Sequence, residues 1–447
     1  MIKIKPKILF LNLPHENRIM RSYFCSYFTG FLSPPYELMR FAASVRDAGY
    51  RVSLIDAVAE SLTLTETLDK MRNYQPDVVY TLAGFESFQE DTHTNSLLKK
   101  AFSKTLFFIG GYYPSLFPEK TLKVSGADYI VKEDTISPLL KFLEAISENK
   151  TTESIPGLAY FQKDKLVNTP QKTFEKPEEQ PMPAYDLIKI NKYAEPLSPS
   201  PYTAIETRRG CSYRCSFCLK NQMPLEPAKP LEKILETFSI LQKEHKIKSV
   251  RFLDNNLLAD KSYALPLLKG LAELPNNKIK WSCMTRPENL TPKIIRLLKK
   301  AGCHRIYFGV ESGSEEMLKI LGKESNLEKI KSLISICNLH GLTTVGLFLF
   351  GIPGETKEDL IMTTNFAIKS GLNFINAGDL KPYPGTILFD EMKNRIDFSL
   401  SPYQLNFKDS DFNDIYTEKE GYFYRKFYFR IGFLLKNFNL LLRNPIK

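Results

Sequence analysis

Short apolar runs alternate with stretches of helical periodicity along the first part of the chain, and this alternation constrains the fold more than any other feature. Residues 7–14 form an apolar run closed by a proline, which is typical of a buried parallel strand. A helix is expected next, over residues 34–49. The same reasoning predicts further strands at residues 51–56, 77–82, 105–111 and 126–131. Strands that alternate with helices predict an α/β fold with a doubly wound parallel sheet, whose ligands bind at the carboxyl ends of the strands.

A second series of strands and helices starts at residue 202. Its first strand, residues 202–207, leads directly into a loop that contains three cysteines. Five more strands are expected, at residues 249–254, 279–284, 305–311, 343–351 and 374–380. Six such units predict a partial (β/α)6 barrel, in which the loops after the strands carry the chemistry.

The three cysteines of that loop, Cys211, Cys215 and Cys218, have the spacing C-x3-C-x2-C. Clustered thiolates select zinc or iron–sulfur. A structural zinc site needs four ligands, commonly as two separated pairs, and neither a second pair nor a histidine at zinc-finger spacing follows here. A [4Fe–4S] cluster normally takes four cysteines, so three would leave one iron open to an outside ligand. The alternative is that three thiols simply pack together.

This motif, with Phe217 just before the last cysteine, resembles the signature of the radical S-adenosylmethionine (SAM) superfamily. The resemblance implies that Cys211, Cys215 and Cys218 bind a [4Fe–4S] cluster and that SAM binds the open iron. It also implies cofactor-binding roles for side chains at the strand ends. These are Asp254 and Asn255 toward the SAM amino group, Arg286 toward its carboxylate, Glu311 and Ser312 toward the ribose, and Gly351 in the segment that packs the adenine. The plain alternatives are an Asx turn for Asp254 and a solvated arginine for Arg286.

The first sheet is similar to the cobalamin-binding domain that precedes many radical SAM cores. The similarity is carried by the Pro34-Pro35 helix start, the strand that ends at Asp56, and the turn Gly110-Gly111-Tyr112. It implies that Gly110, Gly111 and Tyr112 line the cobalamin tail, and glycines there would let the backbone approach a ligand closely. The chain lacks the Asp-x-His-x-x-Gly motif that ligates cobalt from below, so His15 is a poor ligand candidate. The alternative is a domain that has lost cobalamin and only packs.

These readings divide the chain into four parts. We expect a cobalamin-binding-like Rossmann domain at residues 1–147 and a proline-rich linker with a small hairpin at residues 148–200. The radical SAM barrel is expected at residues 201–392, and a C-terminal aromatic and basic helical tail at residues 393–447.

The net charge of +11 is concentrated near the end of the chain. Residues 421–447 contain six basic side chains (Arg425, Lys426, Arg430, Lys436, Arg443 and Lys447) and no acidic one. This placement argues against a nucleic-acid-binding protein. An aromatic and basic helix could contact an anionic membrane surface, and the alternative is that its aromatics pack on the barrel.

The other cysteines, Cys25, Cys283, Cys303 and Cys337, are scattered. They predict reduced, buried thiols in a cytoplasmic protein. A secretory signal is not expected, because the apolar run after the basic start is short and lacks a small-residue cleavage site.

The combined interpretation is an enzyme that cleaves SAM to a 5′-deoxyadenosyl radical and methylates an unactivated carbon of a small-molecule or lipid-like substrate with cobalamin. An electron donor such as flavodoxin or ferredoxin would reduce its cluster. Two alternatives stay open: a cobalamin-binding radical SAM enzyme that cyclises or rearranges its substrate, and a non-catalytic binding protein. The sequence singles out no general base.

Overall fold

The computed structural model describes residues 5–23, 26–28, 30–170, 176–219, 225–323, 325–397, 406–407 and 416–434. Cys25 and the tail beyond residue 434 therefore lie outside the described residues. The chain divides into two compact units, residues 1–205 with 232–250 and residues 206–231 with 251–447. The sequence-based boundaries at residues 147, 200 and 392 stay predictions.

The first unit is built on a seven-stranded sheet with the order β4-β1-β5-β6-β7-β8-β9. Five of its strands are parallel, as the sequence predicted. The hairpin expected in the linker is present as β8 and β9, and it extends the sheet because β8 pairs antiparallel with β7. The strands are β1 Lys7–Asn12, β4 Arg51–Asp56, β5 Val78–Leu82, β6 Leu106–Gly110, β7 Tyr129–Val131, β8 Leu158–Gln162 and β9 Lys165–Asn168.

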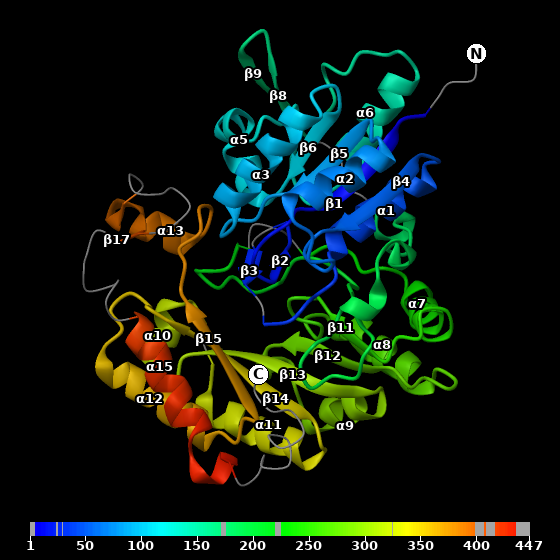
Figure 1. Ribbon diagram of the computed structural model, residues 1–447. Helices are drawn as coiled ribbons and strands as arrows, with labels where there is room; N and C mark the ends of the chain where they lie inside the picture. The colour runs from blue at the N-terminus through cyan, green and yellow to red at the C-terminus, as the bar shows by residue number, and fades with distance from the viewer. Residues whose placement is uncertain are drawn as a thin grey trace. The chain divides into compact units, whose positions relative to one another are not determined.

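Helices flank this sheet, and strands and helices both contribute to its buried apolar core (Figure 1). They are α1 Tyr36–Asp47, α2 Leu64–Tyr74, α3 Phe88–Ala101, α4 Tyr112–Leu116, α5 Pro118–Ser125 and α6 Ser137–Ser147, whereas α7 Leu231–Lys243 lies in sequence between the first two strands of the second sheet. Helix α2 begins at a capping box, in which the Thr63 hydroxyl accepts from the Glu66 amide and the Glu66 carboxylate accepts from the Thr63 amide. A short hairpin that the sequence did not predict, β2 Ile19–Arg21 with β3 Ser26–Phe28, follows β1.

The six strands expected in the second series form one sheet with the order β10-β11-β12-β13-β14-β15. The pairs from β12 to β15 are parallel. The strands are β10 Tyr202–Ile205, β11 Ser249–Phe252, β12 Lys280–Thr285, β13 Cys303–Glu311, β14 Thr343–Phe350 and β15 Phe374–Asp379. The helices are α8 Lys261–Glu273, α9 Pro292–Lys300, α10 Glu315–Ile320, α11 Leu327–Leu339, α12 Lys357–Lys369, α13 Ile387–Met392 and α15 Tyr416–Tyr428. The remaining short strands are β16 Ile396–Asp397 and β17 Asn406–Phe407. Both sheets therefore confirm the predicted α/β class.

Helix α15 lies along α12 and against β15, the last strand of the second sheet (Figure 1). Phe423 and Phe427 are fully buried, and the Phe423 ring lies 5.1 Å from the ring of Phe348 on β14. The described part of the tail thus buries Phe423 and Phe427, as expected if the tail's aromatics pack on the barrel, whereas Phe429 is 74% exposed. Among the described residues, no helix has both the length and the apolar character needed to cross a membrane.

Two tyrosines of α15 bond the open edge of β15. The Tyr428 hydroxyl accepts from the Ile375 amide at 3.0 Å and donates to the Ile375 carbonyl at 2.9 Å. The Tyr424 hydroxyl makes the same pair of bonds to Ala377, at 2.8 and 3.3 Å. The spacings match, because four helical residues rise about 6 Å and two strand residues about 7 Å. The side chains therefore take the place of a neighbouring strand.

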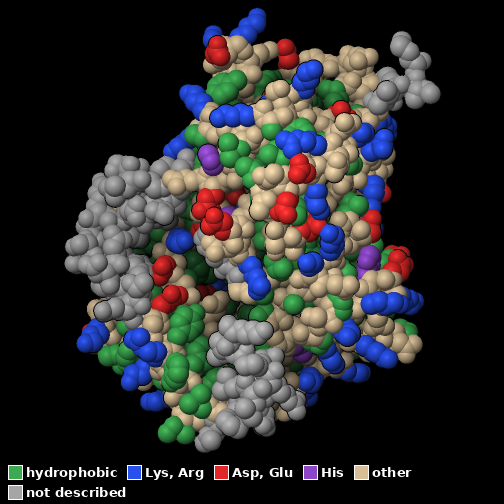
Figure 2. All heavy atoms as spheres, in the orientation of Figure 1, with side chains coloured by type: hydrophobic (Ala, Val, Ile, Leu, Met, Phe, Trp, Pro, Cys, Tyr) green, Lys and Arg blue, Asp and Glu red, His purple; other side chains and the backbone are tan. Residues whose placement is uncertain are grey.

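On the face shown in Figure 2, Lys and Arg side chains are interspersed with Asp and Glu and with uncharged groups. This view of the described residues shows mixed charge over the surface. The predicted basic patch of the tail extends beyond residue 434, outside the described part.

Replacing Tyr424 and Tyr428 tests whether their hydroxyls stabilise the edge of β15. Tyr424→Phe and Tyr428→Phe should each lower the free energy of unfolding by about 1 kcal/mol, because a backbone amide and carbonyl lose their partner. The matched control is Tyr422→Phe on the same helix, which should stay within about 0.5 kcal/mol of the parent protein. Chemical denaturation measures all three. Equal stability of the Tyr428→Phe variant and the parent would show that the Tyr428 hydroxyl does not stabilise the edge of β15.

Candidate functional site

The cysteine loop follows β10, and backbone hydrogen bonds join the residues before the cysteines to those after them. The Glu226 amide donates to the Arg209 carbonyl at 3.0 Å, and the Lys229 amide donates to the Thr207 carbonyl at 2.8 Å. Within the loop, the Cys218 amide donates to the Cys215 carbonyl at 3.1 Å. These bonds fix the path of the chain on both sides of the cysteines.

A buried carboxylate holds the start of this loop from the end of β11. Asp254 is 3% exposed and accepts hydrogen bonds from the amides of Thr207 and Arg208, at 3.0 and 3.3 Å, and from the Thr207 hydroxyl. Burial raises the pKa of Asp254 to about 6, although the bonds from Thr207 act to lower it. Both of its oxygens are thus engaged within the protein. This geometry favours a role as an anchor of the loop over the predicted contact with the SAM amino group.

Two asparagines beside Asp254 extend this support. The Asn255 side-chain amide donates to the Gly210 carbonyl at 3.3 Å, one residue before Cys211. Asn256 is buried, accepts from the Thr285 hydroxyl at 2.9 Å and donates to the Asn289 side chain at 2.9 Å. The sequence reasoning did not single out Asn256, because its partners come from the next strand and turn.

Arg286 directly follows β12 and lies beside the cysteine loop. Its Nη1 lies 3.5 Å from the Cys215 sulfur, and its guanidinium stacks on the Tyr213 ring at 4.0 Å. Its Nε pairs with Glu288 at 3.1 Å. Three contacts orient the guanidinium beside the cysteine loop, where it can offset thiolate charge and bind an anionic group.

Glu311 is the last residue of β13 and Ser312 follows it, but their surroundings differ. Glu311 has a φ of +67°, a left-handed conformation that is unusual for a residue with a side chain, and it pairs with Lys323 at 2.7 Å. The Ser312 hydroxyl is fully buried and bonds Thr363 on α12 at 3.0 Å. Of the two, Glu311 is therefore the better placed to bind a ligand, and Ser312 ties the turn to α12.

Phe217 and Gly351 lie at the same end of the sheet. The Phe217 ring packs against a buried apolar cluster made of Met317, Leu321, Ile352, Leu380, Leu388 and Met392. Gly351 has a φ of +74° and donates its amide to the Glu355 carboxylate at 2.8 Å. The Glu355 carboxylate is also paired with Lys419 of α15. The segment predicted to pack the adenine is thus a fixed turn.

The donor set of the loop fits an iron–sulfur cluster. All three cysteines are partly exposed, and none of them forms a disulfide. Burial raises the pKa of the Cys215 thiol, while the charges of Lys323 and Arg286 act in the opposite direction and favour thiolate. Among the described residues, no three His, Cys, Asp or Glu side chains are grouped around the position of a single metal ion. A [4Fe–4S] cluster presents a different iron to each cysteine, so its ligands stand further apart than those of one ion.

The residues predicted to line the cobalamin tail follow β6 in the first unit. A Cβ on Gly110 would lie 2.1 Å from the Tyr80 hydroxyl, and one on Gly111, whose φ is +136°, would lie 2.4 Å from the Ala83 carbonyl. The protein's own β5 strand and its following turn therefore already require both glycines. Tyr112 begins α4, and burial raises its pKa to about 12.

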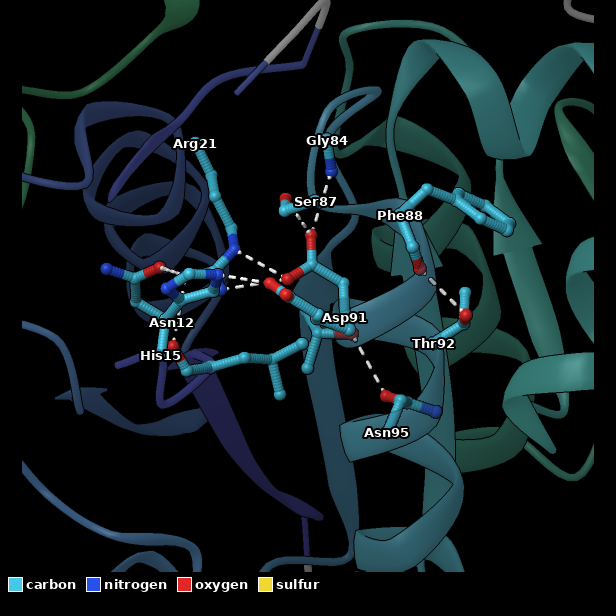
Figure 3. A network of polar contacts seen from close by, with 12 residues as sticks. Asn12, His15, Arg21, Gly84, Ser87, Phe88, Asp91, Thr92 and Asn95 are labelled. Atoms are coloured by element: carbon cyan, nitrogen blue, oxygen red, sulfur yellow. Dashed lines mark hydrogen bonds and ion pairs between the residues drawn. The ribbon is translucent and has the colours of Figure 1, made fainter. Parts of the chain in front are cut away.

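A buried polar network lies at the carboxyl ends of β1 and β5, and Figure 3 shows its side chains converging on Asp91. The Arg21 guanidinium bonds Asp91 at 2.8 Å and the Asn12 side chain at 2.8 Å. Asp91 also accepts from the Gly84 amide and the Ser87 hydroxyl. A buried charge pair is costly unless its groups are bonded, and here both oxygens of Asp91 accept hydrogen bonds while Arg21 donates through Nε and Nη1.

His15 contacts the edge of this network (Figure 3). Its Nδ1 accepts from the Asn17 amide at 2.9 Å, and its Nε2 contacts the Glu90 carboxylate. Both ring nitrogens thus have partners within the protein, which agrees with the expectation that His15 is a poor cobalt ligand. Asp56, also predicted at this edge, accepts from Asn12 and from the Tyr193 hydroxyl.

Comparison with known proteins identifies both parts of the chain. Residues 205–367 match the model of the radical SAM superfamily, and residues 29–139 match that of the B12 binding domain. The chain therefore contains a radical SAM domain preceded by a B12 binding domain. With a B12 binding domain before this radical SAM domain, it is similar to the cobalamin-dependent radical SAM methyltransferase family. The cofactors of this family are a [4Fe–4S] cluster, SAM and cobalamin.

Three individual proteins illustrate the similarity. An uncharacterized methyltransferase of Pyrococcus horikoshii is 29% identical over 392 residues, which cover 86% of this chain and 82% of that protein. The anaerobic magnesium-protoporphyrin IX monomethyl ester cyclase of Cereibacter sphaeroides is 25% identical over 83% of this chain and 62% of that protein. The structure of the radical SAM methyltransferase TsrM from Kitasatospora setae, with cobalamin and a [4Fe–4S] cluster bound, superposes with a TM-score of 0.68. It is 19% identical and covers 87% of this chain and 75% of that one, so it supports the fold.

The anchoring role of Asp254 can be tested by iron content. In Asp254→Ala the amides of Thr207 and Arg208 lose their buried acceptor, so we expect cluster affinity to fall roughly 10- to 100-fold. The matched control is Asp359→Ala, which removes a buried carboxylate that also accepts an amide and a hydroxyl, both from Thr356, at the start of α12. Iron and sulfide analysis after reconstitution should show a loss for Asp254→Ala only. Equal iron content in the two variants would contradict the anchor.

Proposed function

We propose that this enzyme transfers a methyl group from cobalamin to an unactivated carbon of a small-molecule or lipid-like substrate. The observation that carries the proposal is the anchored loop with three cysteines, in a chain that also has a B12-binding domain. The methyltransferase name of the relative from Pyrococcus horikoshii supports methylation as the outcome. The substrate itself has no local signature in the sequence.

The proposed cluster ligands are Cys211, Cys215 and Cys218. When bound, the cluster and cobalamin supply reductive cleavage of SAM to methionine and a 5′-deoxyadenosyl radical, and the methyl group that is transferred. The protein's part is to bind and orient: Arg286 offers its guanidinium to the SAM carboxylate, and Glu311 offers a carboxylate oxygen to ribose hydroxyls. Phe217 and the apolar residues behind it exclude water from the reacting groups.

In the first unit, we propose that cobalamin binds at the carboxyl ends of the strands, beside Gly110, Gly111 and Tyr112. The Arg21–Asp91 network keeps this edge rigid, since each member is buried and bonded. Because both nitrogens of His15 already have partners, we propose that His15 does not ligate cobalt.

A second candidate reaction is cyclisation or rearrangement of the substrate by the same radical. The cyclase of Cereibacter sphaeroides favours it, because that relative matches 83% of this chain. The two reactions share SAM cleavage and differ in whether the methyl group of a second SAM is consumed.

Partners and location follow as further proposals. A reduced flavodoxin or ferredoxin would supply the electron that the cluster needs, and nucleic acid is not expected as a partner. We place the protein in the cytoplasm, because its cysteines outside the triplet that the structure describes, Cys283, Cys303 and Cys337, are buried free thiols.

Anaerobic reconstitution with iron, sulfide and cobalamin tests the reaction. We expect about four irons per chain and formation of both 5′-deoxyadenosine and S-adenosylhomocysteine. Formation of 5′-deoxyadenosine alone would favour the cyclisation alternative. The absence of both products would overturn the proposal.

Cys215→Ala should lose SAM cleavage entirely and most of its iron, because one of three ligands is missing. The matched control is Cys337→Ala, which removes a buried thiol of α11 outside the loop and should keep iron and both products. Survival of SAM cleavage in Cys215→Ala would show that the loop does not hold the cluster.

A further inference from the structure

The carboxylate of Glu311 lies in space that is open because residue 309 of the same strand is a glycine. A Cβ on Gly309 would lie 2.5 Å from Glu311 Oε1 and 2.9 Å from Lys323 Nζ, so only glycine leaves room for this ion pair. The register between β13 and β14 shifts between Gly309 and Glu311, and Glu311 itself has a φ of +67°. A strained non-glycine residue beside a bulge marks a position that the surrounding structure enforces.

Lys323 is what enforces the position of the carboxylate. Its side chain is 4% exposed, and its ammonium donates to Glu311 Oε1 at 2.7 Å and to the Gly309 carbonyl at 2.5 Å. An ammonium buried in this way is costly unless it is paired, so lysine and glutamate depend on each other. Glu311 Oε2 has no hydrogen-bond partner among the described residues.

The segment that carries Lys323 also holds the cysteine loop. The Ser216 amide donates to the Leu321 carbonyl at 3.0 Å, and the Ser216 hydroxyl donates to the Ile320 carbonyl at 3.3 Å. Two residues after Lys323, the Ser325 hydroxyl donates to Glu288 at 2.5 Å, and Glu288 is the partner of Arg286. Residues 320–325, of which residue 324 is not described, thus connect the cysteine loop, Glu311 and Arg286 through short bonds.

We propose that Lys323 is a positioning residue for SAM: it takes one oxygen of Glu311 and thereby presents the other, Oε2, to the vicinal hydroxyls of the ribose. The inference rests on the proposed function, since it assumes that SAM binds at the cysteine loop. Through residues 320–322, the same segment sets the distance between that carboxylate and the cysteines. Lys323 would act through Glu311, without touching the reacting atoms.

Binding measurements on the reconstituted enzyme test this role. Lys323→Met leaves Glu311 buried and unpaired and could fail to fold, so the double variant Lys323→Met with Glu311→Gln, which removes both charges, accompanies it. The probes are SAM and its 2′,3′-dideoxy analogue, with affinity measured by equilibrium dialysis. We expect the double variant to bind SAM roughly 10- to 100-fold more weakly than the parent, because a charged acceptor for the hydroxyls is lost.

The analogue separates positioning from general damage. Since it lacks the hydroxyls, the parent and the double variant should bind it with equal affinity. The matched control Lys319→Met, an exposed lysine on the neighbouring helix α10, should bind both ligands as the parent does. Equal SAM affinity in the double variant and the parent would overturn the inference, and so would an equal loss for SAM and analogue.

The outcomes also separate this inference from the proposed function. A parent enzyme that holds no iron or does not bind SAM would refute the proposed function itself. A parent that binds iron and SAM, with a double variant that still discriminates between SAM and the analogue as the parent does, would refute ribose binding by Glu311 and with it the positioning role of Lys323, while leaving SAM cleavage at the cysteine loop untouched.

Discussion

The cysteine loop depends on one buried interaction, the carboxylate of Asp254 accepting backbone amides of the residues that precede the cysteines. A loop with three thiols has little apolar surface of its own to bury, so its shape must come from hydrogen bonds to rigid neighbours. Asn255 and Asn256 add bonds to the loop and to the next strand end. The second sheet thus supplies a fixed frame, and the loop is positioned by side chains from its strand ends.

The same principle recurs in the first unit with different residues. Asn12 and Asp56 face each other in the register of β1 and β4, and Arg21 joins them to Asp91 on α3. Every one of these side chains is buried. Polar groups at the carboxyl edge of a parallel sheet are usually the ones that meet a ligand, yet here many of them bind one another. Such satisfied networks keep an edge in one conformation, at the expense of leaving fewer groups free for ligands.

The sequence predicted the strands of both sheets well, because buried parallel strands leave a local signal of short apolar runs between helices. It also singled out the loop with three cysteines, since these cysteines lie within ten residues of one another. It could not show that Asp254 faces the backbone of Thr207, because an acidic residue after a strand looks the same whether it meets a ligand or an amide. Lys323 was missed for a related reason: its partner Glu311 lies across a helix, and a single lysine in a loop carries no pattern. The tail's aromatics fitted either a surface helix or a packed one, and only the contacts of Tyr424 and Tyr428 decide between them for the described residues.

Tyr424 and Tyr428 also bear on how the second sheet resists aggregation. An unpaired edge strand is a template on which another chain can add a strand, and proteins usually protect such edges with charges, prolines or bulges. In this protein the amides and carbonyls of Ile375 and Ala377 are already taken by phenol groups, whose stacked rings cover the strand. A fragment that ends before α15 would expose that edge. We therefore expect such fragments to associate through β15, even when the rest of the barrel folds.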